Sequence, residues 1–183
     1  MRHPNASAEV RWGRLKEKQR SGVLRLPHCP SMDALMAMRG CESVKTVAVD
    51  LCCRVVAEEK LSAAQRVVTS LNFAFLGNPG TGKSIAAKHL GQLLLELRLR
   101  RKSIFKETTG EALEREGGDK AAKLIDECVD GVLCVDKAAA LNPRKSNEGR
   151  AVLNQLLAAA ETHRERLTII LCAGPSARSF RAR

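Results

Sequence analysis

The residues with the clearest chemical potential form one short run that matches the spacing GxxxxGK[ST] in full: Gly77, Asn78, Pro79, Gly80, Thr81, Gly82, Lys83 and Ser84. Its glycines allow the backbone N–H groups to turn inward around an anion. A helix that begins here adds partial positive charge, Lys83 can reach the terminal phosphates of a nucleotide, and the Ser84 hydroxyl can bind Mg²⁺. The run therefore predicts a site for ATP or ADP with Mg²⁺.

A second candidate is Asp136, the carboxylate that ends the apolar stretch 131–135. If this stretch is a buried strand parallel to the one before Gly77, Asp136 lies near the phosphates and shares Mg²⁺ with Ser84. The alternative is a strand-end aspartate that only caps the next turn.

Lys137 follows Asp136, at the position where a nucleotide hydrolase usually carries a glutamate that polarises the attacking water. A protonated lysine has no acceptor and cannot take a proton from water. In the alternative, Lys137 simply points to solvent. In both cases the general base is missing, so we expect weak hydrolysis and assign no catalytic residue.

The elements that must position these residues alternate along the chain. The stretches 71–76, 131–136 and 167–172 are apolar and indicate buried strands, and 103–108 indicates a fourth. Apolar residues at helical spacing predict helices that begin near residues 43, 83, 119 and 147. Strands with few polar positions, separated by amphipathic helices, are typical of a parallel sheet covered on both faces. The predicted fold class is α/β.

The 183 residues leave room for one domain, or for one domain and an arm. We expect residues 1–31 to form a basic, flexible arm, because they hold breaking prolines and no sustained apolar period, and residues 32–183 to form the core. The first thirty residues carry seven basic and two acidic side chains, a net charge of +5 out of +11 for the whole chain. This charge makes a polyanionic partner a hypothesis, with a merely solvated arm as its alternative.

Composition excludes several classes of function. Aromatic residues are 3% of the chain, which argues against sites built on stacked rings. No apolar run approaches the roughly 18 residues that a membrane-spanning helix needs, so no membrane contact is predicted. The seven cysteines form no CxxC pair and several lie in apolar stretches, which is typical of buried thiols in a reducing compartment. We therefore expect a cytoplasmic protein. The arginine-rich start leaves organellar targeting as an alternative, against which Glu9 and Glu17 count.

The chain resembles, over residues 35–174, the AAA+ ATPases of the branch that contains CbbX-type rubisco activases and stage V sporulation protein K. The likeness lies in the stretches 39–45, 72–84, 131–138 and 167–174. The resemblance implies a P-loop NTPase core with a doubly wound parallel sheet, ring-shaped hexamers, and ATP-driven remodelling of partner proteins. It also implies that Met38 to Cys41 lie beside the adenine.

Several residues depart from the family pattern. The Walker B position that carries the family's catalytic glutamate is Lys137, so this motif is degenerate. The pore aromatic expected between Gly110 and Lys123 is missing, and Ala173-Gly174-Pro175 stand where a polar sensor residue is expected. The chain ends at Arg183, before the last core strand and the helical lid of the family, so we expect an incomplete core with 71–76 as an unpaired sheet edge.

Three hypotheses follow. The first is an ATP-binding AAA+ module, with protein partners or ring subunits. The second is a non-catalytic scaffold that binds partners through basic surfaces. The third is a nucleic-acid binder, which only the charge supports.

Overall fold

The computed structural model describes residues 6–59, 61 and 70–174. Its centre is a parallel sheet of four strands, β1 (Phe73–Leu76), β2 (Phe105–Thr109), β3 (Val132–Asp136) and β4 (Thr168–Ala173). The strand order is β1-β4-β3-β2, and every pair is parallel. The predicted α/β class is confirmed, with strand bounds that differ from the expected ones by one or two residues.

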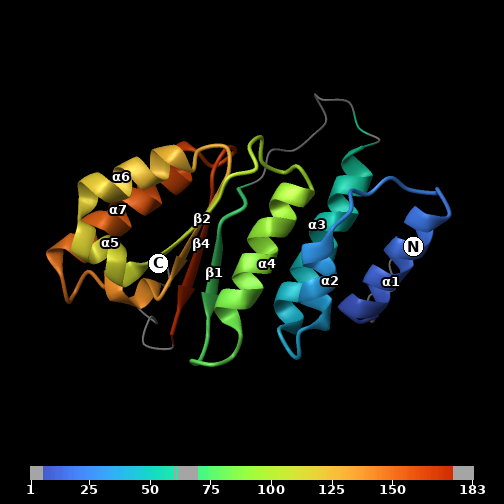
Figure 1. Ribbon diagram of the computed structural model, residues 1–183, viewed down its shortest axis with the longest axis horizontal. Coiled ribbons are helices and arrows are strands. Elements are labelled where there is room, and N and C mark those ends of the chain that lie inside the picture. The colour runs from blue at the N-terminus through green and yellow to red at the C-terminus, as the bar shows by residue number, and fades with distance from the viewer. Residues whose placement is uncertain (1–5, 60, 62–69, 175–183) are drawn as a thin grey trace.

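Helices cover both faces of the sheet (Figure 1). One face carries α4 (Lys83–Glu96), and the other carries α5 (Gly110–Glu116), α6 (Gly118–Glu127) and α7 (Asn147–Thr162). A single-turn 3₁₀ helix, η2 (Ala138–Leu141), follows β3. The sheet is thus doubly wound, which is why the central strands β3 and β4 are buried on both sides.

Side chains of β3 alternate between two apolar clusters. Val132 and Cys134 pack in the cluster on the α4 side, whereas Leu133 and Val135 pack in the cluster beneath α5 to α7. On β4, Cys172 is buried in the α4 cluster as well, and its hydrogen bond with Cys134 together with burial raises the pKa of its thiol far above the usual range. Both cysteines are buried core residues, as their apolar neighbours in sequence predict.

Three further helices form a layer outside α4: α1 (Ala8–Arg20), α2 (Pro30–Ala37) and α3 (Glu42–Glu58). Helices α2 and α3 pack against α4, and α1 packs against α3 (Figure 1). Ser31 anchors α2, because its hydroxyl donates to the Glu96 carboxylate of α4 over 2.7 Å.

Helix α1 lies within residues 1–31, for which we expected a basic, flexible arm; residues 1–5 lie outside the described part. The Trp12 indole donates to Asp33 (2.8 Å) and the buried Lys45 ammonium donates to Glu9 (2.7 Å). Ala8, Trp12 and Leu15 also pack in the core, but three apolar positions among many charged ones are too few to stand out as a period. A domain boundary at residue 31 and a polyanion contact stay predictions.

The β1 strand lies at one end of the sheet. In the part of the chain that the structure describes, β4 is its only partner strand, and its outer edge faces a pocket instead. The Leu76 side chain remains 54% exposed. None of the helices in the described residues is long and apolar enough to cross a lipid bilayer.

The tight start of β3 yields a stability prediction. A Cβ on Gly131 would lie 2.5 Å from the Ile104 carbonyl oxygen and 2.8 Å from the Ile104 Cβ, so the backbone must shift to admit it. We expect Gly131→Ala to lower the free energy of unfolding by about 1–3 kcal/mol in a urea titration. Gly13 in α1 is the control: it has open space around it, and Gly13→Ala should raise stability by about 0.5–1 kcal/mol. A neutral Gly131→Ala variant would contradict the packing described here.

The docking of α1 yields a pH prediction. The hydrogen bond from Lys45 lowers the pKa of Glu9 from 4.5 to about 2. A carboxyl whose pKa is lower in the folded state stabilises that state above its unfolded pKa, and this contribution is lost as the pH falls towards the folded value. Acidification from about pH 4.5 to 2 should therefore weaken the docking of α1.

Trp12, the one tryptophan of the chain, is 4% exposed in α1 and reports this change. Its fluorescence emission should shift to longer wavelengths across that pH range, and Glu9→Gln should remove most of the shift. An unchanged acid transition in Glu9→Gln would show that other groups control the docking of α1.

Candidate functional site

The loop between β1 and α4 contains the predicted phosphate-binding run. Gly80 and Gly82 adopt left-handed backbone angles, with φ of 76° and 77°, which glycine adopts without strain. Gly82 is the N-cap of α4, and no side chain caps the first turn. The N–H groups at the start of this 14-residue helix are therefore free of side-chain partners and can bind an anion.

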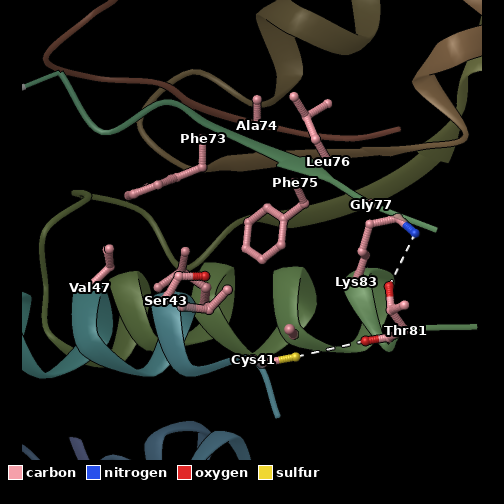
Figure 2. Close-up of a pocket in the computed structure, with 13 residues that line it drawn as sticks. Cys41, Ser43, Val47, Phe73, Ala74, Phe75, Leu76, Gly77, Thr81 and Lys83 are labelled. Atoms are coloured by element: carbon pink, nitrogen blue, oxygen red, sulfur yellow. Dashed lines mark hydrogen bonds between the residues drawn. The ribbon is translucent and has the colours of Figure 1, made fainter. Parts of the chain in front are cut away.

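Lys83 folds back over this loop. Its ammonium donates to the Asn78 carbonyl oxygen over 2.5 Å and lies 3.5 Å from the Thr81 hydroxyl (Figure 2). The Thr81 hydroxyl in turn donates to the same Asn78 oxygen over 2.8 Å. The loop thus holds a cation at its centre, where phosphate oxygens can replace the neutral carbonyl as the acceptor.

The side chains of Ser84 and Asp136 meet at the carboxyl end of the strands. The Ser84 hydroxyl donates to Asp136 Oδ2 over 2.8 Å, and the Lys137 backbone N–H donates to Asp136 Oδ1 over 2.7 Å. A hydroxyl and a carboxylate are oxygen ligands of the kind that Mg²⁺ prefers, so this pair fits the predicted metal ligands. The structure therefore brings together the two residues that the sequence analysis selected from positions 52 residues apart.

Lys137, at the expected glutamate position, forms an ion pair. Its backbone is left-handed, with φ of 48°, and its ammonium lies 3.0 Å from the Glu111 carboxylate on α5. A Cβ on Gly110 would come within 2.6 Å of the Lys137 carbonyl oxygen, so this close approach requires a glycine. Sequence reasoning missed Glu111, although the parallel register of Thr109 with Asp136 places the residues that follow both strands together.

A pocket of about 560 Å³ opens between β1, α3 and α4, next to the loop (Figure 2). Phe73 and Phe75 of β1 form one wall, and Ser43 and Val47 of α3 form the other. Its mainly apolar lining suits a planar aromatic base. No motif in the sequence marks these walls.

The segment 38–41, which the resemblance expects beside the adenine, contacts the phosphate loop. The Cys41 thiol donates to the Thr81 carbonyl oxygen over 3.8 Å, and the Met38 Cε atom lies 3.1 Å from the Cβ position of Gly82. At the end of β4, the Ala173 carbonyl accepts from the Gly77 N–H over 3.3 Å. Pro175 and the arginines of the tail lie outside the described residues.

Comparison with known proteins identifies the class. Residues 73–182 match the model of the ATPase family associated with various cellular activities (AAA), and the chain belongs to this family. The family agrees with the loop, with Lys83 and with the parallel sheet. Membership of this family also implies nucleotide binding, typically together with Mg²⁺.

The relatives are longer proteins. The ESX-1 secretion system protein EccA1 of Mycobacterium tuberculosis is 34% identical over 132 residues, which cover 68% of this chain and 22% of the relative. The ESX-3 secretion system protein EccA3 of Mycolicibacterium smegmatis is 33% identical over 120 residues, 62% of this chain and 19% of the relative. The chain thus spans about a fifth of these curated relatives.

The fold also has a neighbour among solved structures, PCH-2 of C. elegans, with a TM-score of 0.55 and 18% identity over 87% of this chain and 44% of that one. This likeness concerns the fold alone.

Proposed function

We propose that this chain binds ATP or ADP with Mg²⁺ through residues 77–84 and Asp136, as the nucleotide-binding module of an AAA ATPase that remodels partner proteins. The observation that carries the proposal is the 2.8 Å contact between the Ser84 hydroxyl and the Asp136 carboxylate, beside the inward-facing ammonium of Lys83. This arrangement combines anion-binding groups and oxygen ligands for a metal within one loop and one strand end.

In this proposal each residue has a separate role. The backbone N–H groups of Gly80 to Ser84 hold the phosphates, and Lys83 neutralises the terminal ones. Ser84 and Asp136 would hold Mg²⁺, which offsets the charge of the phosphate oxygens. The base enters the pocket between Ser43 and Phe75, on the side where Cys41 contacts the loop.

We propose further that hydrolysis by this chain is weak. Lys137 occupies the catalytic glutamate position of the Walker B motif, and its ammonium is paired with Glu111. A protonated lysine cannot accept a proton from the attacking water. Loss of a positioned general base typically slows a reaction by 10²–10⁴.

Membership of the CbbX and stage V sporulation protein K branch, assembly with ring subunits or other protein partners, and a cytoplasmic location are part of this proposal. The sequence likeness at 39–45 and 131–138 supports the branch. Among the described strands β1 pairs only with β4, and Leu76 is 54% exposed, which supports contact with another chain because an open apolar edge favours association.

The alternative is a scaffold that keeps the fold without using nucleotide. The net charge of +11 favours an acidic partner or a nucleic acid in that case. Two of the basic residues in α1 are, however, already paired with carboxylates, Arg11 with Asp50 and Lys16 with Asp33. Nucleotide titration separates the two functions.

The first test of the site is Lys83→Ala. A hydrogen bond to a charged group contributes about 1.5–3 kcal/mol, so the affinity for Mg-ATP should fall by about 10- to 100-fold in a calorimetric titration. Lys88→Ala is the matched control, because Lys88 lies on the same helix but pairs with Glu107 over 3.0 Å. Equal affinity in the wild type and in Lys83→Ala would reject the proposed site.

The second test is Lys137→Glu, which supplies the missing base. Turnover of ATP under single-turnover conditions should rise by at least about tenfold if the remaining groups are in place. Lys137→Gln separates the causes, since it removes the positive charge without adding a base. No increase in Lys137→Glu would show that groups other than Lys137 limit the reaction.

A further inference from the structure

The residue beside the predicted metal ligand is a cation whose present partner is weak. Lys137 and Glu111 lie 3.0 Å apart, and both side chains are 60% exposed. Exposed ion pairs of this kind contribute little, because water and salt screen them and both side chains lose freedom. The Lys137 ammonium can therefore leave Glu111 when a stronger anion binds nearby.

The backbone of Lys137 lies close to the phosphate loop. One carboxylate joins the two sites, because Asp136 accepts from the Ser84 hydroxyl over 2.8 Å and from the Lys137 N–H over 2.7 Å. Ser84 is the neighbour of Lys83, whose ammonium marks the centre of the loop. The flexible four-carbon stem of a lysine allows the Lys137 ammonium to move from Glu111 towards an anion held there.

The backbone at Lys137 is constrained by the start of α5. Its left-handed φ of 48° is a conformation that a residue other than glycine or asparagine rarely adopts, and such strain is typical of functional positions. Gly110, the first residue of α5, permits the close approach, and Glu111 comes next in the chain. The partner of Lys137 is thus fixed to the first turn of a helix, not to a free loop.

We propose that Lys137 leaves Glu111 to bind the terminal phosphate of ATP and so makes the site prefer ATP to ADP. Because ADP lacks the third phosphoryl group, Lys137 remains with Glu111 in the ADP complex. The first turn of α5 is then released from Lys137 only when ATP is bound. The inference rests on the proposed nucleotide site and assigns the lysine at the expected glutamate position a role in nucleotide discrimination.

A double-mutant cycle tests this assignment, with the affinity of the full chain for Mg²⁺ complexes of a non-hydrolysable ATP analogue and of ADP as the readout. Lys137→Met should weaken binding of the ATP analogue about tenfold and leave ADP within about twofold, since only the former loses a charge-assisted contact. Glu111→Gln should strengthen binding of the ATP analogue about two- to fivefold, because it removes the competing carboxylate. In the Lys137→Met background, Glu111→Gln should have no effect.

The chain offers a matched control in Lys88 and Glu107, a second exposed pair at 3.0 Å that lies on α4 and β2. Lys88→Met and Glu107→Gln should leave the ratio of ATP-analogue to ADP affinity unchanged. Hydrogen exchange gives an independent readout: amides 110–116 should exchange faster with the ATP analogue than with ADP. If Lys137→Met fails to fold, Glu111→Gln and hydrogen exchange still test the proposal.

Three outcomes would overturn it: equal loss of both affinities in Lys137→Met, no effect of Glu111→Gln, or the same effect of Glu111→Gln with and without Lys137. Nucleotide binding that depends on Lys83 would in each case leave the proposed site intact. Absence of nucleotide binding by the wild type would instead reject the proposed function, so the two failures are distinguishable.

Discussion

The contact between the Ser84 hydroxyl and the Asp136 carboxylate depends on the parallel sheet. In a parallel sheet, the carboxyl ends of all strands lie on the same side, and helices return the chain across the faces. Here β1 ends at the phosphate loop and β3 ends at Asp136, with β4 between them. The register of β4 with both neighbours fixes how far each strand extends, so the two residues meet over 2.8 Å. The pairing of these strands thereby determines the geometry of a polar site.

Charge is distributed unevenly around that contact. Asp136 accepts from the Ser84 hydroxyl and from the Lys137 backbone N–H, and the Lys137 ammonium pairs with Glu111 at the start of α5. Lys83, which precedes Ser84, adds a second cation at the loop. An AAA ATPase with a glutamate after the aspartate would have two carboxylates here and one cation fewer. This distribution supports the proposal that the site holds polyphosphate and activates water poorly, since additional positive charge stabilises a bound anion and a protonated Lys137 cannot accept a proton.

Local spacing in the sequence was sufficient to predict the residues that act within one loop or at the start of one helix. The loop 77–84 follows from its glycines, and the Ser146 N-cap, whose hydroxyl accepts from the Gly149 N–H over 3.0 Å, is visible as a serine before an apolar period. Other parts depend on contacts that no local pattern encodes. Helix α5 has only seven residues and one large buried side chain, Leu113, so it produces no detectable period. The pairing of Lys137 with Glu111 requires the β2–β3 register, which only the folded sheet defines.

Of the three outer helices, α3 begins at Glu42, next to the start that the apolar spacing predicts, whereas α1 and α2 have no counterpart among the predicted helices. Cys41 and Met38, at the junction of α2 and α3, lie against Thr81 and Gly82, so the position of this layer determines the shape of the pocket mouth. That layer is held on α4 by Ser31 and Glu96, and on α1 by buried Lys45. Apolar packing holds this layer as well, because Met32 and Leu35 of α2 and Val49 of α3 are buried in the same cluster as the inner face of α4. The pocket wall that α3 provides therefore rests on the same core as α4, the helix that follows the phosphate loop.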